Sequence, residues 1–222
     1  MNFIMRLVDN RDPASLAAKF RRRRFEKFKD LIQKLPRPIK ILDVGGTETF
    51  WKVVGVGEME HVEITLLNLQ LVPTSLPGFR AIVGDATDLS QFSDGYFDVV
   101  FSNSVIEHLG TYSSQSRMAQ EVRMVGKCYW IQTPNYYFPI EPHFLFPGFH
   151  WLPLKARVWL VAHFDLGWYK RAENVEMAKE IMQSIRLLKR RITQIISRWK
   201  NCITKDYLDW LNHSLFMMVF ER

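Results

Sequence analysis

Short apolar runs alternate with longer amphipathic stretches along this chain between residues 39 and 133. An apolar run of about four to eight residues that is bounded by turn residues indicates a buried strand, and apolar residues at helical spacing indicate a helix. On this basis strands are predicted at 39–44, 62–68, 79–84, 97–101 and 127–133, with helices at 48–56 and 113–124 and a helical turn at 105–109. Strands that alternate with helices form a parallel, doubly wound sheet.

The pattern is different on either side of this region. Residues 14–35 carry apolar residues at helical spacing after Asp12-Pro13, a typical helix start, and they predict a helix that covers the sheet. Residues 134–172 break the rhythm and hold eleven of the thirty aromatic residues and five of the ten prolines. A long segment of this kind is commonly functional. Beyond it, a helix is predicted at 175–190 and strands at 192–199 and 214–220.

These elements predict an α/β fold. We expect a Rossmann-like, doubly wound, seven-stranded and mostly parallel sheet, with a helical, aromatic-rich insertion after the fifth strand. The expected organisation is an N-terminal cover helix at 1–38, a core formed by 39–133 and 173–222, and a substrate-cover insertion at 134–172.

Composition places the chain among ordinary globular proteins, with 222 residues of which 47% are hydrophobic and 24% are charged. The two cysteines, Cys128 and Cys202, have neither a metal-binding spacing nor a disulfide framework, so no metal is expected. No run of about 18 apolar residues is present, and the N-terminus has no long apolar stretch. We therefore expect a cytoplasmic protein without a transmembrane helix or signal peptide.

The net charge of +7 is unevenly distributed. Residues 1–40 contain twelve Lys and Arg against four Asp and Glu, whereas residues 41–126 contain four against eleven. Residues 186–205 contain seven basic residues and no acidic ones. An acidic middle region suits a cationic ligand better than a polyphosphate. The basic flanks could contact an anionic substrate, nucleic acid or a membrane surface, or could be solvated helix faces.

The candidate chemistry begins where the strand at 39–44 ends in Gly45-Gly46 and turns into a helix. Such a turn exposes backbone N–H groups, and glycine lets a ligand approach them. Asp43 precedes the glycines, where a carboxylate would repel a pyrophosphate but would suit a ligand with ammonium and sulfonium groups. The dinucleotide motif G-x-G-x-x-G and the P-loop ending Gly-Lys-Ser/Thr are both absent. These residues favour S-adenosylmethionine over NAD and ATP.

Five motifs in order resemble those of class I S-adenosylmethionine-dependent methyltransferases: ILDVGGTET, ITLLNL, VGDATDL, FDVVFSNSVIEHL and GKCYWIQTPN. The likeness is closest to a small-molecule branch that includes quinone-biosynthesis enzymes. It covers residues 39–135 and the last strand. It implies a methyltransferase that uses S-adenosyl-L-methionine and releases S-adenosyl-L-homocysteine.

The resemblance also implies which residues bind the cofactor: Asp43, Gly45, Gly46, Thr47, Asn68, Leu69, Asp85, Ala86, Asn103 and Ser104. Thr47 and Thr49 replace later glycines of the first motif, and Asn68 stands where the family usually has an acidic residue for the ribose hydroxyls. Simpler interpretations remain open. Asn68 could cap a strand end, Asp85 could be a turn residue, and Asn103 could cap a helix.

His108 and Glu107 are the candidate catalytic residues, because they follow the fourth predicted strand near the expected methyl group. Both could instead serve helix packing. Within the insertion, the candidate substrate-binding residues are Tyr136, Tyr137, His143, Phe146 and His150. Such aromatic residues could line an acceptor pocket or form the insertion's own core.

The leading hypothesis is a methyltransferase of a small or lipophilic acceptor that works as a monomer or homodimer. The amphipathic stretch 154–164 also allows a peripheral membrane contact. One alternative is an RNA methyltransferase, but Ser102-Asn103-Ser104-Val105 lacks the Asn/Asp-Pro-Pro-aromatic run that grips a flipped base, so nucleic acid is not expected. The other alternative is a non-catalytic, cofactor-binding partner protein.

Overall fold

A six-stranded sheet is the central element of the computed structural model, which describes residues 16–55, 60–189 and 216–221. The strand order is β3-β2-β1-β4-β5-β8. The strands are β1 (Ile39–Val44), β2 (Val62–Asn68), β3 (Phe79–Val83), β4 (Phe97–Asn103), β5 (Gly126–Pro134) and β8 (Phe216–Glu221). The first five pair in parallel, and β8 runs antiparallel to β5. Because β1 lies between β2 and β4, the predicted doubly wound α/β fold is confirmed.

The predicted count of seven strands is wrong for the described residues, whose main sheet has five parallel strands and one antiparallel strand. The strand predicted at 192–199 lies outside the described residues. The strand predicted at 214–220 corresponds to β8, the antiparallel partner of β5.

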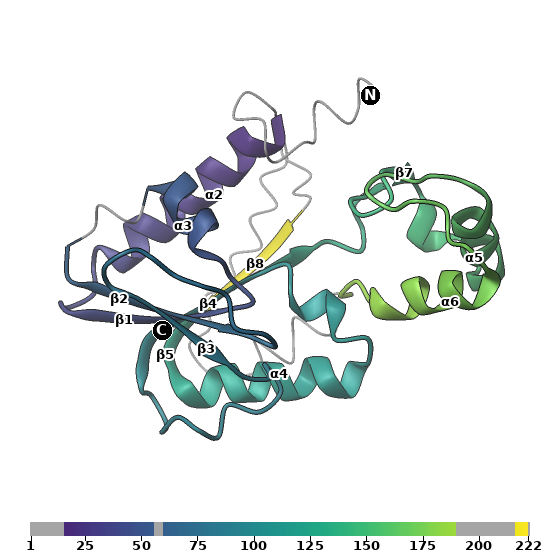
Figure 1. Cartoon of the computed structure of the whole chain (residues 1–222). Helices are drawn as coiled ribbons and strands as arrows, with labels where there is room; N and C mark the ends of the chain where they lie inside the picture. The colour runs from purple at the N-terminus through teal and green to yellow at the C-terminus, as the bar shows by residue number, and fades with distance from the viewer. Residues whose placement is uncertain (1–15, 56–59, 190–215, 222) are drawn as a thin grey trace.

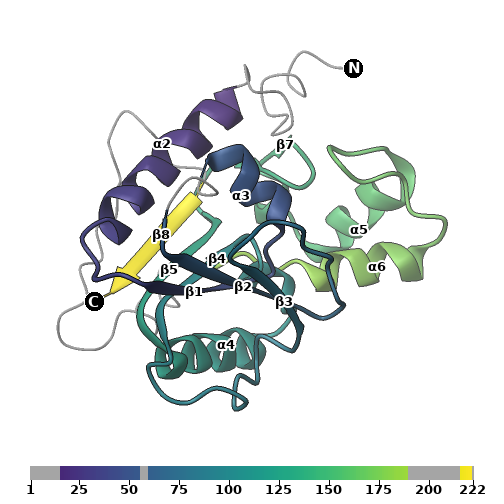
Figure 2. The ribbon, with the colours of Figure 1, turned by 60° about the vertical axis from the view of Figure 1, so that its left-hand side comes forward.

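Helices cover both faces of the sheet (Figures 1 and 2). On one face lie α2 (Leu16–Ile32) and α3 (Glu48–Val54), and on the other lies α4 (Tyr112–Val125). The core on the α2 side is aromatic: the Phe28 ring lies 4.9 Å from that of Phe101 and 5.6 Å from that of Trp130. Burial of such large rings explains why a helix before the first strand is held against the sheet. A helix therefore covers this face of the sheet, and it ends at Ile32, three residues before the predicted end at residue 35.

Two further predicted helices also end earlier in the structure. The helix predicted at 48–56 ends at Val54, because Gly55 adopts a left-handed conformation with a φ of 74° and its N–H bonds back to the carbonyl groups of the last turn. The helix predicted at 175–190 is α6 (Val175–Ser184). Ile185 is extended, and Leu188 forms a bridge with Asn135. Tertiary pairing therefore ends this helix earlier than its sequence pattern predicts.

The insertion after β5 has its own apolar core. It contains β6 (Ile140–Glu141), β7 (Phe146–Pro147), η2 (Phe149–Trp151) and α5 (Leu154–His163). Phe144 and Phe149 are buried in a cluster that also includes Ala178 and Met182 of α6. We therefore propose that the substrate-cover insertion extends from residue 134 through α6, beyond the boundary expected at residue 172.

Among the residues that the structure describes, no helix is both long enough and apolar enough to cross a bilayer.

Candidate functional site

The loop after β1 brings backbone close to three other segments. Gly45 has a φ of +77°, which favours glycine, and its N–H donates to the carbonyl of Leu67 at 2.8 Å. A Cβ on Gly45 would lie 2.3 Å from Val105 Cγ2. A Cβ on Gly46 would lie 1.6 Å from Asp43 Oδ2. Glycine is therefore required at both positions, and the Asp43 carboxyl group lies directly against the loop.

Asp43 is a buried carboxyl group with an aromatic donor. Trp51 of α3 donates from Nε1 to Asp43 Oδ2 at 2.6 Å, and Asp43 Oδ1 has no hydrogen-bond partner among the described residues. Burial raises the pKa of Asp43 to about 7, and the hydrogen bond from Trp51 opposes this increase. The acid that precedes the glycines is thus poised to ionise when a cationic group binds nearby.

The start of α3 fixes the far side of the loop. Thr47 is the N-cap, and its hydroxyl accepts from the N–H of Phe50. The Glu48 carboxylate accepts from the Ser75 hydroxyl at 2.8 Å and from the Leu76 N–H at 3.1 Å. Lys52 and then Ser75 contribute most to lowering the pKa of Glu48 to about 2. Glu48 therefore stays ionised and ties α3 to the loop between β2 and β3.

Asn68, at the carboxyl end of β2, also supports the glycine loop. Its Nδ2 donates to the carbonyl of Gly46 at 2.9 Å. Leu69, the next residue, is 75% exposed. An amide can make this bond, whereas a carboxylate has no proton to donate. The departure from the acidic residue usual in the family therefore has a structural reason in this loop.

For the expected S-adenosylmethionine site, replacing Asn68 with aspartate is predicted to weaken rather than improve cofactor binding, although it restores the residue usual in the family that the motifs resemble. The substitution removes the donor to Gly46 and places a carboxylate against a carbonyl oxygen, at a cost of about 1 kcal/mol. Calorimetry with S-adenosylhomocysteine should show an affinity about fivefold lower. The matched variant Glu63→Gln changes an exposed residue of the same strand and should bind normally. Tighter binding by Asn68→Asp would contradict this role.

The turn after β3 contains the two residues predicted to contact adenine. Asp85 is exposed, and its Oδ1 accepts from the N–H of Thr87 at 2.8 Å and from the Thr87 hydroxyl at 2.9 Å. Ala86 is 7% exposed and packs in the core on the α4 side. Oδ1 of Asp85 therefore acts as the turn interpretation predicts. Its two bonds to Thr87 also hold the exposed Asp85 carboxylate in a fixed orientation.

The end of β4 is conformationally unusual. Asn103 is the last residue of the strand and pairs with Gln132 of β5. Ser104 has a φ of 59°, which is uncommon outside glycine, and its N–H donates to the carbonyl of Gln132 at 2.9 Å. Backbone strain of this kind is often found at functional sites. Asn103 does not begin a long helix, because Val105 intervenes before the short η1 (Ile106–His108).

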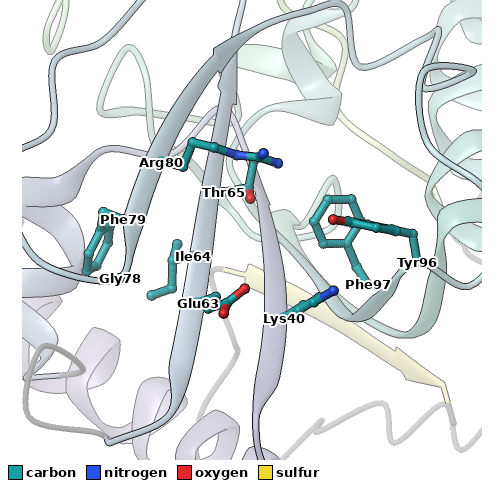
Figure 3. A pocket seen from close by; sticks show the side chains of 9 residues that line it. All are labelled: Lys40, Glu63, Ile64, Thr65, Gly78, Phe79, Arg80, Tyr96 and Phe97. Carbon is teal, nitrogen blue, oxygen red and sulfur yellow. The ribbon is translucent and has the colours of Figure 1, made fainter.

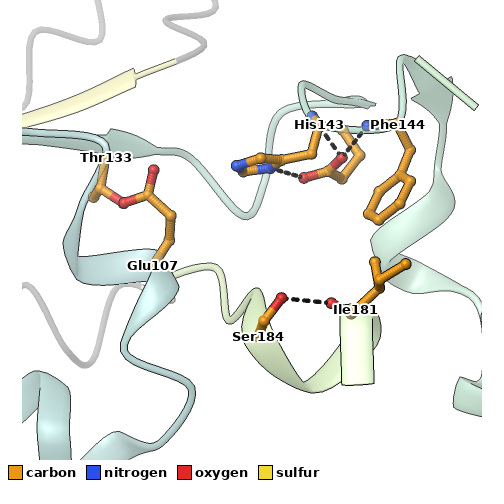
Figure 4. A network of polar contacts seen from close by, with 7 residues as sticks. Glu107, Thr133, His143, Phe144, Ile181 and Ser184 are labelled. Atoms are coloured by element: carbon orange, nitrogen blue, oxygen red, sulfur yellow. Dashed lines mark hydrogen bonds and ion pairs between the residues drawn. The ribbon is translucent and has the colours of Figure 1, made fainter. Parts of the chain in front are cut away.

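Three ionisable side chains gather beyond this strand end. Glu107 and His108 belong to η1, and His143 comes from the insertion; one ligand atom from each lies within 4.8 Å of the others. Figure 4 shows the His143 ring reaching toward the Glu107 carboxyl group. Burial raises the pKa of Glu107 to about 7, and burial together with the nearby His143 lowers the pKa of His108. The candidate catalytic pair thus lies beside a residue predicted to bind the acceptor.

The other predicted acceptor residues lie in different environments. Tyr136 packs against the buried His150, with 5.2 Å between ring centroids, and burial lowers the pKa of His150. Tyr137 is 55% exposed. Phe146 packs against the core of the insertion, with its ring 6.0 Å from that of Phe149. Phe146 therefore belongs to the insertion's own core, which was one of the two interpretations of these aromatic residues. His143 instead lies beside Glu107 and His108.

A separate hollow of about 300 Å³ lies at the amino ends of the strands (Figure 3). Lys40, Thr65 and Arg80 line it together with Tyr96, whose ring lies 4.7 Å from the ammonium group of Lys40. Ligands of doubly wound sheets bind at the opposite edge, beyond the carboxyl ends of the strands. We therefore place the candidate site at the glycine loop rather than in this hollow.

Sequence reasoning did not identify three residues that position this site. Trp51 bonds Asp43, Glu48 ties the loop that contains Ser75, and Glu141 accepts from His143 Nδ1 at 2.7 Å. Glu48 lies within the glycine motif and Trp51 lies just after it. The signal that could have identified them is their position on the inward face of the short helix that follows the glycines. Glu141 lies two residues before a histidine in an irregular segment, where no periodic pattern indicates its role.

The chain matches a known family over part of its length. Residues 46–127 match the family model described as a methyltransferase domain. Over these residues the chain is therefore similar to methyltransferase domains, and its doubly wound sheet agrees with that similarity. The matched region ends before the insertion at residue 134, so it carries no information about the acceptor.

An uncharacterised protein of Mycobacterium tuberculosis, found in two strains, is 41% identical over 66 residues. The match covers 30% of this chain and only 22% of that relative. That protein is described as uncharacterised, so the match adds no function to the family similarity.

Solved structures show the same general similarity. The CurJ carbon methyltransferase is 11% identical with a TM-score of 0.48, over 86% of this chain and 50% of that chain. The 1,6-didemethyltoxoflavin-N1-methyltransferase of Burkholderia thailandensis is 15% identical with a TM-score of 0.37, over 50% and 52% of the respective chains. These scores are too low to support an argument about substrate or mechanism.

Proposed function

We propose that this chain is an S-adenosylmethionine-dependent methyltransferase that transfers a methyl group to a small or lipophilic acceptor. The observation that carries the proposal is the glycine loop packed against the buried Asp43 carboxyl group at the carboxyl end of β1. That loop presents backbone to a ligand, and the acid favours a cationic one. S-adenosylmethionine has both an ammonium and a sulfonium group.

In the proposed complex, residues at neighbouring strand ends bind different parts of the cofactor. We propose that Gly45, Gly46, Thr47 and Asp43 face the methionine part, and that Asn103 and Ser104 border it from β4. Asn68 and Leu69 would lie at the ribose. Asp85 would accept from the adenine amino group, with Ala86 beside the ring. Support comes from the shared edge of the sheet, since β2, β1 and β4 are adjacent parallel strands.

The insertion supports the proposed acceptor class. His143 of the insertion lies next to Glu107 and His108. Tyr136 follows β5 and packs against His150. Trp159 on α5 is 53% exposed and belongs to an apolar groove of about 370 Å³ between α5 and α6. Such exposed apolar surface suits a lipophilic acceptor or a peripheral membrane contact.

In methyl transfer the protein itself forms no covalent bond with either reactant. The acceptor attacks the sulfonium methyl carbon, the carbon–sulfur bond breaks, and S-adenosylhomocysteine leaves with the electron pair on sulfur. The protein aligns the two reactants and excludes water. A hydroxyl acceptor must also lose a proton, and we propose that Glu107 and His108 are the catalytic residues that promote this loss.

Two measurements test the proposed function. Calorimetry should show that both S-adenosylmethionine and S-adenosylhomocysteine bind, and the absence of binding at millimolar cofactor would exclude the function. An assay for S-adenosylhomocysteine release should then be run over phenols, quinone precursors, sugars, carboxylates and lipids. Turnover with RNA alone would favour the nucleic-acid alternative, and binding without turnover would favour a non-catalytic partner protein.

Replacing Asp85 with alanine is expected to weaken S-adenosylhomocysteine binding about tenfold, because one hydrogen bond to a charged group is lost. Asp88→Ala is the matched control, since Asp88 also accepts from a backbone N–H two residues ahead, that of Ser90. It should leave the affinity within about twofold of that of the unmodified protein. Calorimetry measures both variants, and equal losses would show that the adenine turn has been misplaced.

A further inference from the structure

Three potential metal ligands meet in space although they are far apart in the sequence. Glu107 and His108 lie in η1 after β4, and His143 lies in the insertion after β6. One carboxylate oxygen and one nitrogen from each imidazole lie within 4.8 Å of one another. The two imidazole rings are 5.1 Å apart and nearly perpendicular, at 88°. The two imidazole rings are therefore not stacked face to face, and a nitrogen of each ring can point toward one shared metal position.

Glu107 provides a second, independent indication of a ligand. Its side chain is 0% exposed, and its Oε2 accepts from the Thr133 hydroxyl at 3.0 Å. Its Oε1 is buried and has no hydrogen-bond partner among the described residues. A buried carboxylate oxygen without a partner is costly, so such an atom calls for a cation or a donor.

His143 is held as a metal-ligating histidine commonly is. Its Nδ1 bonds Glu141 Oε1 at 2.7 Å. Glu141 Oε2 in turn accepts from the N–H groups of His143 and Phe144, both at 2.8 Å, and the Glu141 side chain is 2% exposed. A fixed carboxylate on Nδ1 leaves Nε2 as the free ring nitrogen, and the ring points toward Glu107 (Figure 4).

We propose that Glu107, His108 and His143 bind one divalent transition-metal ion, such as zinc, and leave a position open for an oxygen of the acceptor. Two imidazoles and one carboxylate form the ligand set of open catalytic metal sites. Tetrahedral zinc ligands lie about 3.3 Å apart, so small rotations of these side chains close the site. No metal was expected from the cysteine spacing. That spacing cannot reveal this site, because its ligands are a glutamate and two histidines from two separate segments.

The metal would define the acceptor class, an inference that rests on the proposed methyltransferase function. Glu107 and His108 would then promote proton loss as metal ligands rather than as bases, because a metal-bound hydroxyl group has a lowered pKa and would lose its proton to solvent near neutral pH. The resulting oxygen attacks the methyl carbon, and the carbon–sulfur bond breaks with its electron pair moving to sulfur. The products are a methyl ether and S-adenosylhomocysteine. The acceptor is therefore a phenol, an enol or another compound with an ionisable hydroxyl group.

Calorimetry with zinc chloride on the chelator-treated full chain tests the site without any need for turnover. One zinc ion per chain should bind. Glu107→Gln, His108→Gln and His143→Gln should each lower the zinc affinity at least tenfold, and Glu141→Gln, which removes the charge that orients His143, about tenfold. His163→Gln is the control, because that exposed ring on α5 bonds the carbonyl of Trp159 outside the cluster.

The outcomes separate the two proposals. No zinc binding at millimolar zinc, or zinc binding that every variant retains, would overturn the metal site. His108 is exposed, so His108→Gln should keep the melting temperature of the metal-free protein and report on binding alone. S-adenosylhomocysteine binding without zinc binding overturns only the metal site, whereas zinc binding without S-adenosylhomocysteine binding overturns only the proposed function.

Discussion

Gly46→Ala is expected to lower the affinity for S-adenosylhomocysteine about 100-fold, or about 2.7 kcal/mol. The new Cβ would lie 1.6 Å from Asp43 Oδ2 and 2.1 Å from its Cγ. Asp43 cannot move aside without breaking its bond from Trp51, because the carboxyl group is buried. The loop must shift instead, and overpacking of this kind also costs about 2–3 kcal/mol of unfolding free energy. Calorimetry and urea denaturation measure the two effects.

Gly55→Ala is the matched control for this prediction. Gly55 has a φ of +74°, but a Cβ there would meet only Lys29 Nζ at 3.7 Å. It should cost about 1 kcal/mol of stability through backbone strain and leave cofactor affinity unchanged. In the double variant Asp43→Ala/Gly46→Ala the clashing carboxyl group is gone, so the second substitution should cost much less stability. Normal cofactor binding by Gly46→Ala would refute the arrangement of the loop.

Trp51→Phe is expected to destabilise the fold by an amount that depends on pH. Phenylalanine retains an aromatic ring but removes the donor to Asp43 Oδ2, 2.6 Å away. We expect a loss of about 2 kcal/mol at pH 8, where Asp43 is ionised, and about 1 kcal/mol at pH 5.5, where it is protonated, because charged hydrogen bonds are stronger. Urea denaturation across this pH range gives both values.

The sign of the pH dependence follows from the raised pKa of Asp43. The folded value of about 7 exceeds the ordinary 3.8, so between these values the folded state binds more protons than the unfolded state. The contribution of Asp43 to the free energy of unfolding therefore falls as the pH rises through this window. Asp43→Asn should remove that slope, and Trp51→Phe should extend it to higher pH. An equal loss at both pH values would show that Trp51 contributes only packing.

Much of the fold could be predicted because local patterns and tertiary packing agree. The strand at Ile39–Val44 is apolar and ends in glycines, and the structure gives it those bounds. Predictions failed where long-range contacts decide. The helix 175–190 stops at Ser184 because Leu188 pairs with Asn135, and the number of strands depended on a segment outside the described residues.

The candidate site could be predicted in outline but not in its hydrogen bonding. The motifs placed Asp43, Gly45 and Gly46 together because they are adjacent in the sequence. They could not show that Asn68 donates to the Gly46 carbonyl. Nor could they bring His143 to Glu107, since that proximity depends on how the insertion packs against the end of β4.

The proposed donor and acceptor halves of the site come from different parts of the chain. Asp43, Gly46, Asn68 and Asp85 all belong to the sheet region before residue 134, whereas His143 belongs to the insertion, which has its own core. An exchange of the insertion between homologous proteins could therefore alter which compound is methylated and leave the methyl donor unchanged. For enzyme engineering, the segment from residue 134 through α6 is the natural unit to graft.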